Sequence, residues 1–243
     1  MQTYFDYLYN PVYDITTARL NQYRKLQTKC IEKLDLCEND KVLCVGLGTG
    51  NELVTMLKKK LNINIVGIDY SKTALRKASK KAKEFGKRVE LFLQDARNLE
   101  FANSSFDKVL CIHVMDFVDD EIKVTAEIMR TLKNGGRFAI TYPSGRENTR
   151  MGFKLLVDSI RNNMNSGKST IATFLESFIQ VIAGIVYLPL LFRVNRKSYK
   201  RNELKDIFYQ VLDPSILIEE DPLYQDYIVY GKKLIKGENQ DAS

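Results

Sequence analysis

The sequence predicts an α/β fold: a doubly wound, seven-stranded, mostly parallel sheet with a helical cap inserted after its fifth strand. Two observations support this prediction. From Lys41 to Tyr142, short apolar runs alternate with helical patterns, as in a parallel sheet that helices cover on both faces. Farther along, two short apolar runs flank Asp221-Pro222, which predicts an antiparallel pair of strands that completes the sheet.

The expected elements follow one another in a regular order. Strands are predicted at 41–46, 63–68, 88–93, 106–112, 135–142, 216–218 and 227–230, and helices at 15–36, 50–61, 71–86, 119–133 and 202–212. Asn134-Gly135-Gly136 is expected to end the helix at 119–133 and turn into the next strand. The chain then divides into an N-terminal helical cap segment (1–37), a ligand-binding core (38–145), a helical lid insertion (146–200), a C-terminal helix with a hairpin (201–236) and a tail expected to be disordered (237–243).

Composition limits the classes of protein to which the chain can belong. Its 243 residues, 44% hydrophobic and 28% charged, suffice for one α/β domain with additions. The net charge of +7 suits an acidic partner, an anionic membrane surface or RNA, or simply a lysine-rich surface. With one histidine, and four cysteines at no metal-ligand spacing, we expect no metal site, and reduced thiols fit a cytoplasmic location. The first ten residues lack a basic-then-apolar leader, so no secretory signal is expected.

A glycine-rich turn after the first strand of the core indicates a ligand site. Gly46, Gly48 and Gly50 alternate here, and glycine lets the backbone approach a ligand closely at a helix N-terminus. Asp69 ends the next apolar run, and an acidic residue about 20 positions after such a loop can bond both hydroxyls of a ribose. The spacing Gly-x-Gly-x-Gly lacks the third glycine position of a dinucleotide fingerprint, which disfavours a nicotinamide cofactor.

Five motifs, in this order and spacing, resemble those of the class I S-adenosylmethionine-dependent methyltransferases, in the type 11-like branch that acts on small molecules. The motifs are Val42–Gly50, Gly67-Ile68-Asp69-Tyr70-Ser71, Gln94-Asp95-Ala96, Phe106-Asp107-Lys108-Val109-Leu110 and Leu132-Lys133-Asn134-Gly135-Gly136. The resemblance covers about residues 38–142. In addition, Asn10-Pro11-Val12-Tyr13-Asp14 is similar to the lead-in helix of quinone and related lipid methyltransferases.

The resemblance implies S-adenosylmethionine as cofactor and S-adenosylhomocysteine as its product. It implies that the glycine loop lines the amino-acid end of the cofactor, that Asp69 binds the ribose, and that Asp95 and the Ala96 backbone bind the adenine. The expected cofactor-binding residues are Gly46, Gly48, Gly50, Asp69, Tyr70, Asp95, Ala96 and Cys111. Where the family usually has an acidic residue, this chain has Cys44; either Glu52 or Asp116 compensates, or the affinity for the cofactor is reduced.

The catalytic residue is less well defined, because methyl transfer needs a general base only when the acceptor must lose a proton. His113, the only histidine, follows the fourth strand, where its ring either accepts a proton or packs under the cofactor. The further candidates for the acceptor pocket are Tyr9, Tyr13, Asp116, Phe117 and Tyr142.

The role of the strongly apolar segment 171–192 stays open. It suits a lid over an apolar acceptor pocket, a peripheral membrane contact formed by 171–201 with its basic residues, or a dimer face. The predicted function is S-adenosylmethionine-dependent methyl transfer to a small hydrophobic or amphipathic acceptor, at O, N or an activated carbon, in the cytoplasm or at a membrane surface. Alternatives are a lipid methyltransferase at a membrane surface, an RNA or protein methyltransferase, and a non-catalytic S-adenosylmethionine-binding protein. No nucleic-acid partner is expected, because no binding domain is appended.

Overall fold

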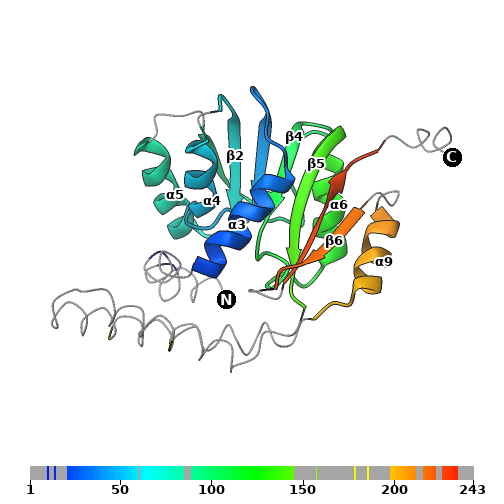
Figure 1. Cartoon of the computed structure of the whole chain (residues 1–243). Helices are drawn as coiled ribbons and strands as arrows, with labels where there is room; N and C mark the ends of the chain where they lie inside the picture. Colours follow the sequence, from blue (N-terminus) through cyan, green and yellow to red (C-terminus); the bar gives the residue numbers. More distant parts are fainter. Residues whose placement is uncertain are drawn as a thin grey trace.

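A seven-stranded sheet organises the fold (Figure 1). The computed structural model describes residues 10, 14, 21–59, 61–84, 89–144, 157, 178, 185, 198–211, 216–222 and 226–234. The elements are α3 (Asn21–Lys33), β1 (Lys41–Val45), α4 (Asn51–Leu57), β2 (Asn64–Asp69), α5 (Lys72–Glu84), β3 (Val89–Leu93), β4 (Phe106–Cys111), α6 (Glu121–Thr131), β5 (Leu132–Tyr142), α9 (Arg201–Val211), β6 (Ile216–Glu220) and β7 (Tyr227–Lys232).

The strand order confirms the predicted doubly wound α/β class. The strands lie in the order β3-β2-β1-β4-β5-β7-β6. β1 pairs in parallel with β2 and β4, whereas β7 pairs antiparallel with both β5 and β6. The chain therefore reverses its direction of travel across the sheet between β1 and β4, which is the point where open α/β sheets bind ligands.

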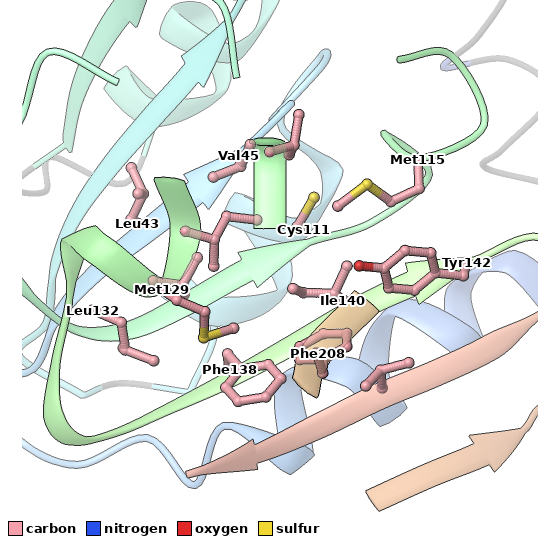
Figure 2. Close-up of a cluster of buried hydrophobic side chains, with 14 of the residues drawn as sticks. Leu43, Val45, Cys111, Met115, Met129, Leu132, Phe138, Ile140, Tyr142 and Phe208 are labelled. Atoms are coloured by element: carbon pink, nitrogen blue, oxygen red, sulfur yellow. The ribbon is translucent and has the colours of Figure 1, made fainter. Parts of the chain in front are cut away.

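Two hydrophobic layers hold the helices on opposite faces of the sheet, because successive side chains of a strand point to opposite faces. Leu43 and Val45 of β1 pack into the layer that includes residues of α6 and α9, such as Ile128 and Phe208. Figure 2 shows part of this layer, where the Phe138 ring stacks on Phe208 with centroids 5.6 Å apart. The alternate residues of β1 face the second layer, which includes residues of α3, α4 and α5.

The start of β5 differs from the prediction. The helix α6 ends at Thr131, and β5 begins directly at Leu132, so the Gly135-Gly136 pair lies inside the strand rather than before it. The pairing of β4 with β5 shifts register over this stretch, and Gly135 has φ +76°. A Cβ on Gly136 would lie 2.8 Å from the Asp107 carbonyl oxygen. The glycines therefore allow an irregularity in the strand, and they do not cap the helix.

Several predicted features fall outside the described residues. These include Tyr9, Tyr13, most of the lid insertion, nearly all of the apolar segment 171–192, and the tail 237–243. Among the residues that the structure describes, no helix is long and apolar enough to cross a membrane.

Candidate active site

A cavity of about 410 Å³ lies at the carboxyl ends of β1, β2, β3 and β4. Each strand contributes the residues that directly follow it. The residues that line the cavity include Gly46, Leu47, Gly48, Thr49, Ile68, Asp69, Tyr70, Ser71, Gln94, Asp95, Ala96, Arg97, Ile112, His113, Val114 and Phe117, joined by Asn10, Tyr23 and Glu52. The cavity therefore lies where the strand order of the sheet predicts a ligand.

The glycine loop forms one wall of this cavity. Gly46 has φ +66°, and a Cβ there would lie 2.1 Å from Val114 Cγ2, so no larger residue fits. Gly48 has φ +58°, and a Cβ there would meet no atom within 4 Å. Gly50 does not line the cavity: it precedes α4, and its side of the loop packs against Ala78. Gly46 and Gly48 thus border the cavity, whereas Gly50 is the N-cap residue of α4.

Asp69 ties the end of β2 to the glycine loop. Its Oδ2 accepts a hydrogen bond from the Gly48 N–H at 2.8 Å, and its Oδ1 accepts one from the Ser71 N–H at 2.8 Å. Both contacts fix the orientation of a carboxylate that also borders the cavity. A carboxylate can accept about four hydrogen bonds, so these two are compatible with further bonds to a ligand diol.

At the other end of the cavity, Asp95 forms a bidentate pair with Arg97. Arg97 Nη2 lies 2.6 Å from Asp95 Oδ2, and Arg97 Nε lies 3.1 Å from each of the two carboxylate oxygens. The guanidinium lowers the pKa of Asp95, which therefore remains an ionised hydrogen-bond acceptor at neutral pH. Tyr70, Ala96 and Arg97 also line the cavity, and of these three Arg97 lies in no motif from which a site residue was predicted.

Glu52 supplies a buried carboxyl group near the glycine loop. Its side chain is only 6% exposed, and its Oε1 accepts a hydrogen bond from Gln27 Nε2 at 2.7 Å. Burial raises the pKa of Glu52. Of the two residues expected to compensate for Cys44, Glu52 borders the cavity and Asp116 does not. Cys44 itself is buried in the hydrophobic layer beside α4.

His113 sits on a left-handed turn after β4, with φ +55°. Its backbone N–H donates to Thr141 Oγ1 at 2.8 Å, and its imidazole ring stacks on Tyr23 with centroids 5.2 Å apart. Its Nδ1 lies 3.2 Å from Asp226 Oδ2 and 3.4 Å from Asp116 Oδ2. Sequence reasoning missed Tyr23 and Asp226, because only the folded sheet brings α3 and the β6–β7 connection to this turn.

Three other predicted site residues lie away from the cavity. Cys111 is fully buried in the layer of Figure 2, paired with Val45 and Ile140, and the cavity begins one residue later at Ile112. Tyr142 is also fully buried there, with its hydroxyl 2.8 Å from Thr125 Oγ1. Asp116 contacts His113 without bordering the cavity. Phe117 does border it, as predicted.

The N-terminal segment is anchored at the mouth of the cavity. Asn10 Nδ2 donates to Ser71 Oγ at 2.9 Å and to Thr73 Oγ1 at 3.1 Å, and Asn10 borders the cavity. Asp14 accepts a hydrogen bond from Thr49 Oγ1 of the glycine loop and one from Lys81 Nζ at 2.8 Å. Sequence analysis associated this segment with the family motif but did not identify these anchors.

The charges of the lining fit a cationic adenosyl ligand. Four acidic side chains border the cavity, namely Glu52, Asp69, Asp95 and Asp119, against the guanidinium of Arg97 and the imidazole of His113. A diol partner, an acceptor for an exocyclic amine and a buried carboxyl group are thus available within one cavity. In the part of the chain that the structure describes, no group of three or more His, Cys, Asp or Glu side chains is arranged to hold a metal ion.

Comparisons with known proteins agree with this site. Residues 43–140, which carry the glycine loop, Asp69, Asp95 and His113, match the methyltransferase domain family. A carboxy-S-adenosyl-L-methionine synthase of Nautilia profundicola is 27% identical over 177 residues, covering 71% of this chain and 72% of that protein. A demethylmenaquinone methyltransferase of Bacillus velezensis is 32% identical over 118 residues, covering 48% of this chain and 51% of that protein.

A solved structure extends the likeness in fold to most of the chain. The crystal structure of an S-adenosylmethionine-dependent methyltransferase from Aquifex aeolicus superposes with a TM-score of 0.60 and 16% identity, covering 92% of this chain and 98% of that one. At this identity, the likeness shows the fold alone. The family match, the strand order and the motif residues around the cavity lead to one conclusion: residues 43–140 form a domain similar to the S-adenosylmethionine-dependent methyltransferases.

Proposed function

We propose that this enzyme transfers the methyl group of S-adenosylmethionine to a small hydrophobic or amphipathic acceptor. The observation that carries this proposal is the cavity at the switch point of the sheet, which both acidic and apolar side chains line. Its volume of about 410 Å³ lies within the range of small-molecule sites, roughly 300–1,000 Å³.

The residues of this chain would hold the cofactor at four points. Asp69 accepts from the ribose hydroxyls, Asp95 and the Ala96 backbone bind the adenine, and Glu52 faces the ammonium group. The bound cofactor supplies a methyl group on a positively charged sulfur, which leaves as a neutral thioether. The carboxylates around the cavity favour the charged ligand, and they fix its position relative to His113, which we propose as the base.

The acceptor would bind on the β4 side of the cavity. Ile112, Val114, Phe117 and Val118 form an apolar wall there. The Bacillus velezensis relative is named for demethylmenaquinone, which supports a hydrophobic acceptor. We also propose that 38–145 forms the cofactor-binding core, that 146–200 covers the acceptor, and that the enzyme works in the cytoplasm, with 171–201 able to contact a membrane.

The test combines binding with product analysis. The purified full chain is titrated calorimetrically with S-adenosylmethionine and S-adenosylhomocysteine. It is then incubated with methyl-labelled cofactor and a panel of quinols, phenols, amines, phosphatidylethanolamine vesicles, tRNA and a protein extract. We expect both titrations to release or absorb heat, and one small acceptor to gain one methylene in mass. Transfer of label to tRNA or to a protein alone would contradict the proposed acceptor class. Because one relative is named a carboxy-S-adenosyl-L-methionine synthase, the mass of the cofactor product is followed too.

A further inference from the structure

Two buried carboxylates from distant parts of the chain meet at one nitrogen of His113. Asp226 is fully buried and comes from the connection between β6 and β7, whereas Asp116 is 3% exposed and follows His113 by three residues. Both approach Nδ1, at 3.2 Å and 3.4 Å. The ring therefore presents its Nδ1 side to the two carboxylates.

The imidazole is also held in place from its other sides. Tyr23 of α3 stacks on the ring with an interplanar angle of 20°, and the backbone N–H of His113 donates to Thr141 Oγ1 of β5, which holds the turn that carries the ring. The backbone is held at φ +55°, a conformation that residues other than glycine rarely adopt. Glu52 of α4 is near enough for its carboxylate to interact electrostatically with the ring. Tyr23 and the two carboxylates thus contact the ring itself, at the edge of the cavity.

We propose, on the basis of the proposed function, that Asp226 is a positioning residue: together with Asp116 it holds His113 as the Nδ1–H tautomer, so that Nε2 takes a proton from the acceptor. A carboxylate at Nδ1–H selects this tautomer, and it stabilises the imidazolium that forms when Nε2 gains a proton. This arrangement is of use only if the acceptor loses a proton during transfer. The acceptor is therefore a group that loses a proton as it gains the methyl group, and a phenol or an enol is the simplest example.

The proton and electron balance of the step is complete without a further reactant. The acceptor proton moves to His113 Nε2, the acceptor oxygen uses the electron pair that it keeps to bond the methyl carbon, and the pair of the broken carbon–sulfur bond stays on sulfur. The positive charge of the sulfonium is thereby replaced by that of the imidazolium. Asp116 and Asp226 stabilise this new charge in a buried setting, where an ion pair is screened little by water.

The single histidine makes a direct test possible. The full chain is labelled with ring-¹⁵N histidine, which gives signals from His113 alone. We expect the neutral ring to carry its proton on Nδ1, and the imidazolium signals to persist to a higher pH than in free histidine. In Asp226→Asn, which keeps the size of the side chain, the imidazolium signals should disappear at a pH lower by about 1 than in the wild type. A wild-type ring protonated on Nε2, or identical spectra for the variant, would overturn the proposal.

Matched variants separate positioning from structural damage. Asp221→Asn serves as the control, because Asp221 lies in the same connection, is also buried, and has its Oδ2 3.9 Å from Lys29 Nζ. If Asp226→Asn fails to fold, the titration is repeated with Asp116→Asn. In this variant too, the imidazolium signals should disappear at a lower pH than in the wild type. The wild-type tautomer decides the proposal in either case.

Kinetics with the acceptor found in the panel complete the test. Asp226→Asn should lower kcat by about 10²-fold or more. Its calorimetric Kd for S-adenosylmethionine should stay within about twofold of wild type. The kcat of Asp221→Asn should not change. The pH dependence of kcat should move with the NMR titration. A variant that retains full kcat would refute the positioning role, whereas failure of the wild type to bind the cofactor would instead refute the proposed function.

Discussion

At the scale of single residues, three carboxyl groups of the cavity differ in their surroundings. Glu52 is buried beside Gln27, Asp69 is fixed by two backbone N–H groups, and Asp95 pairs with an arginine while its side chain is 49% exposed. The pKa of Glu52 is therefore raised, whereas that of Asp95 is lowered. Each carboxyl group suits a different part of a charged adenosyl ligand.

Asp69→Ala should abolish tight cofactor binding. The substitution removes the ribose partner and also the two hydrogen bonds that order Gly48 and Ser71. Charge-assisted hydrogen bonds contribute about 1.5–3 kcal/mol each, so we expect the Kd from calorimetry to rise at least about 100-fold. Asp206→Asn on the exposed face of α9 is the control. A Kd within a few-fold of wild type would show that Asp69 does not contact the cofactor.

Glu52 should make stability depend on pH. Burial raises its pKa above the 4.5 of an exposed glutamate, so above pH 4.5 the folded chain holds this proton longer than the unfolded chain. The stability contribution of this group is therefore present at low pH and is lost as the pH rises through the folded-state pKa. In urea unfolding, Glu52→Gln should gain stability relative to wild type as the pH rises above 4.5, whereas Glu32→Gln on the exposed face of α3 should not. A difference that stays constant with pH would argue against a buried, titrating Glu52.

At the scale of elements, the cavity depends on segments that are anchored across it. Asn10 and Asp14 attach the N-terminal segment to the glycine loop and to α5. On the other side, Arg130 of α6 donates to the carbonyl oxygens of Leu99 and Phe101, which lie beyond Asp95. The walls of the site are therefore held by side chains that lie outside the five motifs of the core.

Asp14→Asn should speed the release of bound cofactor. The substitution removes the charge that pairs with Lys81, and a partly buried pair of this kind contributes about 1 kcal/mol. We expect labelled S-adenosylmethionine to dissociate about fivefold faster in a chase experiment, with Asp206→Asn as control. An unchanged release rate would show that the pair of Asp14 with Lys81 does not control cofactor exchange.

Arg130→Lys should destabilise the whole domain while keeping the charge. Lysine cannot reproduce the fork that contacts Glu127 and the two carbonyl oxygens at 2.7 Å and 2.8 Å. We expect the free energy of unfolding in urea to fall by about 1–3 kcal/mol. The control is Lys123→Arg, at an exposed position of the same helix. A loss of stability as large in the control would point to an effect of the helix surface.

Local signals in the sequence predicted the parts of the site that depend on local geometry. Gly46, Gly48 and Asp69 border the cavity because a strand, a tight turn and a helix are specified within a few residues. Cys111 was assigned to the site wrongly, because a shift of one residue along a strand moves a side chain to the opposite face. Such a shift is smaller than the accuracy with which a strand end can be predicted.

Contacts between distant elements could not be predicted from one sequence. Asp226 and Tyr23 reach His113 only because β7 inserts between β5 and β6 and α3 packs beside the sheet. Neither residue lies in a motif that carries chemistry. Glu52 is an intermediate case: the sequence offers both Glu52 and Asp116 as compensation for Cys44, and the structure shows that Glu52 borders the cavity.

At the scale of the whole molecule, the thiols report on the integrity of both hydrophobic layers. Cys37 is exposed, whereas Cys30, Cys44 and Cys111 are buried, and burial raises the pKa of each buried thiol. We expect a thiol reagent such as dithionitrobenzoate to modify one cysteine rapidly in the native protein and all four in guanidinium. Rapid modification of two or more native thiols would show that one layer opens readily.

The most direct test of the site as a whole is calorimetric titration of the purified chain with S-adenosylmethionine and with S-adenosylhomocysteine. A saturable heat at one site per chain, together with a rise in the unfolding temperature, is expected for both ligands, and both effects should be lost in Asp69→Ala. If neither ligand produces heat or a thermal shift in the wild type, the cavity between the glycine loop, Asp69 and Asp95 does not hold an adenosyl sulfonium.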